Sequence, residues 1–163
     1  MKKFLSHGMV IVAGVVFVPA FAGNADQNVP PTKKEVKKAD PRLETLRRFF
    51  RAGHCPIERL SSVFLAASDA NHLDWRLLPG ISVIESSGGK AFKNNNLFGW
   101  NNGDTPFRSL SEGIRTVASR LAHSPYYRNK STYQKLRTYN ANAEYAANVK
   151  SVMQQISAKI ELD

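Results

Sequence analysis

The stretch Leu73-Asp-Trp-Arg-Leu-Leu-Pro-Gly-Ile-Ser-Val-Ile-Glu-Ser-Ser-Gly-Gly89 decides the fold, because it predicts a buried helix that ends in a polar, glycine-rich turn. Pro79 suits the first turn of a helix, and the isoleucines and valine after it predict a core helix over residues 79–85. The serines and glycines of residues 86–89 then end this helix. Glu85 therefore stands in the last turn of a core helix.

Apolar residues also repeat at helical spacing through most of residues 41–163. The expected helical faces are Leu43, Leu46, Phe49 and Phe50; Ile57, Leu60, Phe64 and Ala67; Leu110, Ile114, Val117, Ala118 and Leu121; and Tyr145, Val149, Val152, Met153, Ile156 and Ile160. Capping boxes at Ser109–Glu112 and Ser131–Gln134 predict two helix starts. Residues 88–107 are the exception, since glycine and asparagine dominate them and residues 101–104 form a turn signal that indicates a short hairpin.

The N-terminal residues have the pattern of an export signal. Two lysines precede the apolar run 9–18, Pro19 ends it, and Ala20-Phe21-Ala22 is typical of a signal-peptidase site. The run is shorter than the roughly 20 residues that span a bilayer. We therefore expect a cleaved signal peptide at residues 1–22 and a periplasmic or secreted protein. Residues 23–40 contain two prolines, four lysines and no aromatic residue, which predicts a disordered basic linker before a folded domain at 41–163.

The charge balance predicts an anionic partner. The chain has 23 basic and 13 acidic residues and a net charge of +10, which falls to +8 without residues 1–22 because these contain two lysines and no acidic residue. Such a protein is attracted to polyanions, which include nucleic acid, anionic lipid and the acidic polymers of an anionic cell-wall surface. Export argues against nucleic acid as the partner. The single cysteine, Cys55, excludes an intramolecular disulfide, and the scattered histidines argue against a zinc site. We expect a monomer with no metal or cofactor.

Glu85 is the leading candidate for catalysis. A carboxylate in the last turn of a helix faces the negative end of the helix dipole, and apolar neighbours add a desolvation penalty. Both effects raise the pKa of the carboxyl group toward the range that a general acid needs near neutral pH. A surface glutamate at a frayed helix end is the alternative interpretation.

Residues 73–89, followed by Asn95-Asn-Leu-Phe-Gly-Trp100, resemble the bacterial glucosaminidase family of peptidoglycan hydrolases, within the lysozyme-like superfamily. The resemblance extends over roughly residues 55–160 and includes later blocks such as Tyr139-Asn140. It implies a mainly α, lysozyme-like domain in which a small irregular or β-hairpin lobe forms a cleft. It also implies cleavage of the β-1,4 bond after N-acetylglucosamine in peptidoglycan glycan strands, with Glu85 as the general acid.

The same resemblance assigns residues that line the cleft. Asn95 and Asn96 are expected to hydrogen-bond acetamido or hydroxyl groups of the substrate. Trp100 is expected to stack on a sugar face, although it could instead only pack the small lobe. Tyr127 and Tyr139 are further substrate-binding candidates that are expected to line the cleft, with Tyr126 as an alternative.

The second catalytic group is left open. Asp104 is the only acidic residue between Glu85 and Glu112, so it is the candidate for the second carboxylate of a glycosidase, unless it is an ordinary turn residue. Tyr139 resembles the tyrosine that orients the catalytic glutamate in lytic transglycosylases. Two alternatives to the hydrolase therefore remain: a lytic transglycosylase that uses Glu85 alone, and a non-catalytic wall-binding module.

Overall fold

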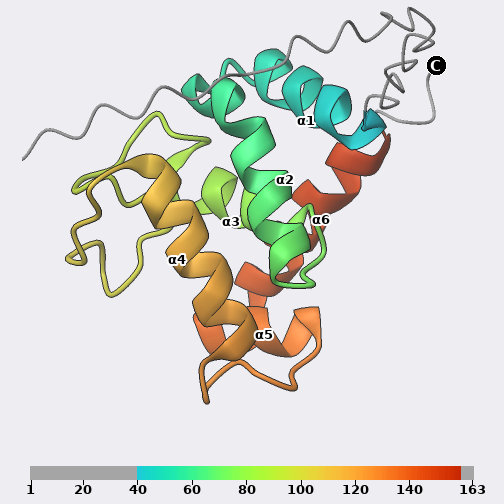
Figure 1. Ribbon diagram of the computed structural model, residues 1–163. Coiled ribbons are helices and arrows are strands. Elements are labelled where there is room, and N and C mark those ends of the chain that lie inside the picture. Colours follow the sequence, from blue (N-terminus) through green and yellow to red (C-terminus); the bar gives the residue numbers. More distant parts are fainter. Residues whose placement is uncertain (1–39, 159–163) are drawn as a thin grey trace, which may run out of the picture. The chain divides into compact units, whose positions relative to one another are not determined.

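The computed structural model describes residues 40–158, and this part of the chain is mainly helical, as the sequence predicts (Figure 1). Its elements are α1 (Pro41–Ala52), the 3-10 helix η1 (Pro56–Leu60), α2 (Ser61–Ala70), α3 (Leu77–Ser86), α4 (Leu110–His123), α5 (Thr132–Tyr139) and α6 (Ala143–Ala158). The expected signal peptide and all but the last residue of the expected linker lie outside the described residues. Within residues 40–158, no helix has the length and hydrophobicity needed to cross a membrane.

The helix that contains Glu85 is central to the packing. α3 packs against α6 and α2, and α2 packs in turn against α4 (Figure 1). Gly80 allows α3 to approach α6 closely, since a Cβ at this position would lie 3.2 Å from the side chains of both Val149 and Met153. α3 begins two residues before the predicted start at Pro79, which therefore lies within its first turn, where a missing N–H leaves no hydrogen bond unmade.

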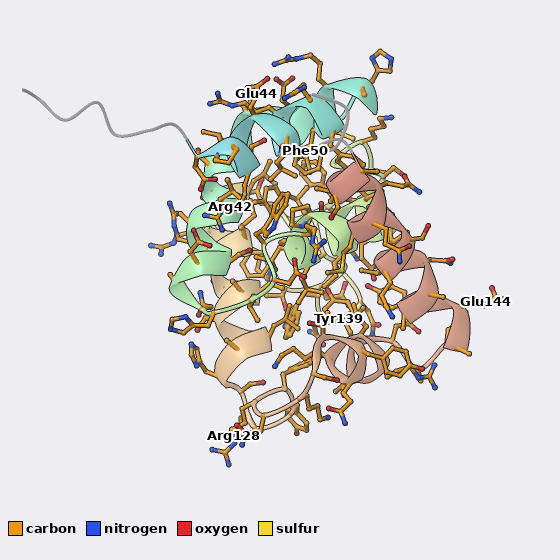
Figure 2. The ribbon with its side chains drawn as sticks, turned by 90° about the vertical axis from the view of Figure 1, so that its right-hand side faces the viewer. Arg42, Glu44, Phe50, Arg128, Tyr139 and Glu144 are labelled. Atoms are coloured by element: carbon orange, nitrogen blue, oxygen red, sulfur yellow. The ribbon has the colours of Figure 1, made fainter. Side chains whose placement is uncertain are left out.

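Three fully buried phenylalanines connect the helical core to the segment after α3. Phe50 points inward from α1 (Figure 2), and its ring centroid lies 5.7 Å from that of Phe64 on α2. Phe64 in turn lies 6.4 Å from Phe98, which belongs to the segment between α3 and α4. Burial of Phe98 therefore fixes this irregular segment against the helices.

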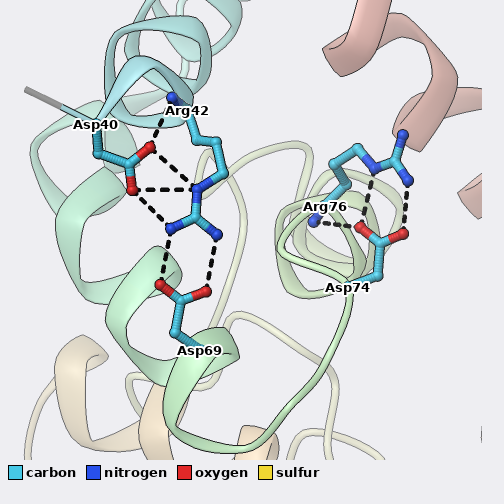
Figure 3. Close-up of polar contacts among 5 residues, drawn as sticks. All are labelled: Asp40, Arg42, Asp69, Asp74 and Arg76. Carbon is cyan, nitrogen blue, oxygen red and sulfur yellow. Dashed lines mark hydrogen bonds and ion pairs between the residues drawn. The ribbon is translucent and has the colours of Figure 1, made fainter.

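Two arginines fix the starts of α1 and α3 (Figure 3). Asp40 caps α1 and pairs with Arg42, which also reaches Asp69 at the end of α2 with an N–O distance of 2.8 Å. Asp74 accepts from the backbone and side chain of Arg76, and Arg76 donates to Ser157 of α6 at 2.5 Å. These contacts connect α1 to α2 and the start of α3 to α6.

The segment 87–109 is irregular, as expected, but it forms turns rather than a hairpin. Residues 101–104 do form a turn, yet no strand occurs anywhere in residues 40–158. The backbone conformation explains the difference, because six residues between positions 94 and 103 have positive φ: Asn94, Asn95, Gly99, Asn101, Asn102 and Gly103. A β-ladder requires extended residues with negative φ, so these positions prevent strand pairing.

Candidate active site

Glu85 lies at the penultimate position of α3 and lines a pocket of about 390 Å³. Its side chain is half-buried. The hydroxyl of Tyr145, from the first turns of α6, donates to Oε1 of Glu85 at 2.7 Å. The close packing of α3 on α6 thus gives the carboxyl group one fixed partner while it remains open to a pocket.

Burial raises the pKa of Glu85, and the hydrogen bond from Tyr145 lowers it by a smaller amount. The net shift is upward, which confirms the direction expected from the sequence. The cause is desolvation by the surrounding protein. A carboxyl group with a raised pKa keeps its proton to higher pH, as a general acid must.

Gly99 brings the backbone of the irregular segment to the other oxygen of Glu85. A Cβ built on Gly99 would lie only 2.6 Å from Oε2. The residue also has a φ of +58°, a conformation that favours glycine. Both its positive φ and the lack of room for a Cβ beside the carboxylate therefore favour glycine here.

Tyr139 and Tyr145 are stacked, with ring centroids 5.9 Å apart and an interplanar angle of 5°. Tyr139, labelled in Figure 2, points into the protein from the end of α5 and donates its hydroxyl proton to the carbonyl oxygen of Phe98. The residue that touches Glu85 is instead Tyr145. The hydroxyl of Tyr139 thus bonds the segment that contains Phe98 and not Glu85, although Tyr139 lines the pocket of Glu85.

Tyr145 is a candidate functional residue that the sequence pattern does not reveal. It lies among aliphatic residues on the buried face of α6, where its spacing indicates only a core position. The signal was its hydroxyl, because a buried tyrosine hydroxyl needs a hydrogen-bond partner. Burial and the neighbouring carboxylate raise the pKa of Tyr145, so it stays a neutral donor.

A second pocket, of about 680 Å³, adjoins the first and has aromatic walls; we call it the aromatic pocket. The ring of Trp100 lies 5.6 Å from that of Tyr139 and 6.0 Å from that of Tyr127. Both pockets are lined by Gly99, Asn102 and Tyr139. The structure thus brings together three of the aromatic residues expected to line a cleft, next to Glu85.

The two candidate asparagines hold the irregular segment. The buried amide of Asn96 donates to the carbonyl oxygens of Trp100 and Thr105, and it accepts from the backbone N–H groups of Phe98 and Trp100. Asn95 donates to the carbonyl oxygen of Phe107 at 2.9 Å. These contacts favour a structural role for both amides over direct binding of a substrate, although Asn96 does line the pocket of Glu85.

Asp104 lies outside the pocket of Glu85. Its exposed carboxylate pairs with Lys93 at 2.8 Å, and Lys93, unlike Asp104, lines that pocket. Glu85 is the only carboxylate among the lining residues. A catalytic role for Asp104 would therefore require it to leave Lys93 and enter the pocket.

Comparison with known proteins adds nothing to the geometry of this site. No protein-family model matches the chain, and no curated protein matches its sequence. In the described residues, no three histidine, cysteine, aspartate or glutamate side chains are grouped as metal ligands would be. The site offers a half-buried carboxyl group with a raised pKa, held by a tyrosine and flanked by aromatic rings, which is an arrangement suited to donating a proton to a ligand in the pocket.

Proposed function

We propose that the protein is an exported peptidoglycan hydrolase with a lysozyme-like domain. It cleaves the β-1,4 glycosidic bond after N-acetylglucosamine in the glycan strand, with Glu85 as the general acid. The observation that supports this most strongly is the raised pKa of Glu85 in a pocket that adjoins the aromatic pocket. The resemblance of residues 73–89 and 95–100 to the glucosaminidase family gives the substrate.

In this mechanism Glu85 transfers its proton to the glycosidic oxygen as the bond breaks. The hydroxyl of Tyr145 keeps the carboxyl group aimed at the pocket and then stabilises the carboxylate that forms. Trp100 offers an aromatic face to a neighbouring sugar. Water completes the reaction, activated either by Asp104 after it leaves Lys93 or by the acetamido group of the substrate.

A lytic transglycosylase is the second candidate. It is favoured by the lining of the pocket, in which Glu85 is the only carboxylate. In that reaction the 6-hydroxyl of muramic acid attacks its own anomeric carbon, so no second protein carboxylate and no water are needed. Glu85 would then act first as acid and later as base.

The cellular setting belongs to the same proposal. The signal-peptide pattern of residues 1–22 directs the protein to the periplasm or the exterior. There its net charge of +8 holds it near the anionic cell wall.

Mass spectrometry of digested cell wall tests the proposal and separates the candidates. A hydrolase that cleaves after N-acetylglucosamine leaves reducing N-acetylglucosamine ends, which is the result we expect. A transglycosylase leaves 1,6-anhydromuramic ends that are lighter by one water. A wall-binding module leaves the strands intact, and this result would contradict both enzymatic candidates.

The Asp104→Asn variant then tests the second catalytic group. A loss of lysis comparable to that of a Glu85 variant supports a two-carboxylate mechanism. A small effect, together with reducing N-acetylglucosamine ends, supports participation of the acetamido group.

A further inference from the structure

The charge on the wall of the aromatic pocket is positive and comes from one arginine. Arg120 is the only charged residue that lines it. Its guanidinium carbon lies 5.8 Å from the ring centroid of Trp100. Arg120 is exposed, and within residues 40–158 it makes no ion pair with a carboxylate. An arginine placed on an aromatic wall with no protein anion beside it is well suited to bind an anion of a ligand.

A second group in the same wall lacks a partner. The hydroxyl oxygen of Ser124, which follows α4 and lines the aromatic pocket, is buried and has no hydrogen-bond partner in the described part of the protein. The backbone N–H of Ser124 donates to the carbonyl oxygen of Arg120, which keeps the two residues adjacent. Buried polar groups are normally hydrogen-bonded, so the hydroxyl of Ser124 has a hydrogen bond to offer a polar ligand atom once its side chain rotates toward the pocket.

We propose that the aromatic pocket binds a sugar that carries a carboxylate, such as muramic acid with its lactyl group, and that Arg120 pairs with this carboxylate. This inference rests on the proposed function. The planar guanidinium group can donate two parallel hydrogen bonds to the two carboxylate oxygens. Trp100 holds the guanidinium on one side and offers aromatic surface to the sugar. In peptidoglycan this carboxyl group is free only where the stem peptide has been removed, because it otherwise forms the amide bond to that peptide. Arg120 thereby selects peptide-free glycan strands over peptide-bearing strands and over neutral strands with the same β-1,4 backbone.

The position of the pocket gives this selection a role in cleavage. The aromatic pocket shares Gly99, Asn102 and Tyr139 with the pocket of Glu85. When a glycan strand fills both pockets, the sugar in the aromatic pocket therefore lies next to the bond that reacts at Glu85. Pairing of the carboxylate with Arg120 then sets the register of the alternating strand. The register decides which of its two kinds of β-1,4 bond lies at Glu85.

Binding measurements on the Glu85→Gln variant, which leaves the ligand uncut, test the inference. Three tetrasaccharides serve as probes: alternating N-acetylglucosamine and N-acetylmuramic acid with free lactyl carboxylates, its lactyl methyl ester, and N-acetylchitotetraose. Adding Arg120→Gln should weaken binding of the acid about 10-fold and leave the other two ligands unchanged. Arg120→Lys should retain part of the preference for the acid. Arg115→Gln is the control, because this substitution removes the same charge from an exposed residue of α4 that lines neither pocket.

Each outcome bears on one claim. Equal weakening for acid and ester would mean that Arg120 only supports Trp100, and unchanged binding would mean that Arg120 does not contact the ligand; either result overturns the inference. If wild-type protein lyses the wall while one of these results is obtained, the proposed function stands without it. If wild-type protein leaves the wall intact and none of the three ligands binds, both fail.

Discussion

At the scale of single residues, two opposing effects set the proton affinity of Glu85. Burial favours the neutral acid, and the hydroxyl of Tyr145 favours the carboxylate. The balance keeps the group protonated to higher pH than an exposed glutamate and still stabilises the anion left after proton transfer. This is the combination that general-acid catalysis near neutral pH requires.

Tyr145→Phe should therefore raise the pKa of Glu85 further, because it removes the interaction that lowers it. A general acid is active in its protonated form, so the alkaline limb of the kcat/KM profile should move to higher pH. Loss of the fixed contact should also lower kcat by roughly 10-fold. Tyr133→Phe is the control, since Tyr133 is exposed on α5. An alkaline limb that stays in place or moves to lower pH would show that Tyr145 does not control the proton of Glu85.

Gly99→Ala should damage the site more than its effect on stability predicts. At its positive φ, a Cβ costs roughly 1 kcal/mol, and here the Cβ would also push against Oε2 of Glu85. Gly103→Ala is the comparison, because its φ is +79° and its Cβ would meet the side chain of Lys93 and not Glu85. Thermal unfolding should show similar losses for both variants, while lysis falls further in Gly99→Ala. Equal activity in the two variants would contradict a close approach of Gly99 to the catalytic carboxyl group.

At this scale the sequence predicted the candidate residues more successfully than it predicted the contacts that each of them makes. The pattern around Glu85 predicted its place at a helix end and its raised pKa. It did not predict the partner of Glu85, because Tyr145 is 60 residues away and occupies a position that an apolar residue would also fill. Nor did it predict that the side chain of Asn96 forms its hydrogen bonds within the segment between α3 and α4. Those partners depend on a loop conformation that the spacing of side chains does not specify.

At the scale of elements, a buried lysine connects the end of α4 to the wall of the aromatic pocket. Lys135 on α5 is almost fully buried and donates to the carbonyl oxygens of Leu121, at 2.9 Å, and Tyr127, at 2.6 Å. The first carbonyl belongs to the last turn of α4, where a cation is favoured by the helix dipole. Lys135 thus positions the backbone of one pocket residue, Tyr127, while it caps a helix.

Lys135→Met should destabilise the protein by about 1–3 kcal/mol, because the methionine keeps the length of the side chain but loses both hydrogen bonds to the carbonyl groups, and only that of Tyr127 keeps another donor, the N–H of Lys130. Lys130→Met is the matched control: Lys130 donates to a single exposed partner, Thr138, and its loss should stay within about 0.5 kcal/mol. Urea unfolding measures both. Similar midpoints for the two variants would mean that the contacts of Lys135 contribute no net stability.

Helix starts were predicted well where a side chain specifies them locally. The capping box of Ser131 and Gln134 is present in full. At α4 the hydroxyl of Ser109 accepts from the N–H of Glu112 as predicted, but the carboxylate of Glu112 accepts from the N–H of Arg108 instead. The expected hairpin is absent because the positive φ angles of residues 94–103 favour turns over paired strands.

At the scale of the whole molecule, the positive charge should act at long range. The net charge of +8 expected after export attracts the protein to an anionic wall, and salt shortens the reach of that attraction from about 10 Å at 0.1 M to about 3 Å at 1 M. Sedimentation of the Glu85→Gln variant with purified cell wall should therefore show weaker association as salt rises. Association that is independent of salt would contradict a role for the net charge.

The central claim is that Glu85 supplies the proton that breaks the glycan strand. The most direct measurement is lysis of purified cell wall by Glu85→Gln, with the wild-type fold verified by circular dichroism. Glutamine fills the same space and can still accept the hydrogen bond from Tyr145, but it has no transferable proton, so lysis should fall by at least ~100-fold. Lysis at a near-wild-type rate by the folded variant would contradict the claim.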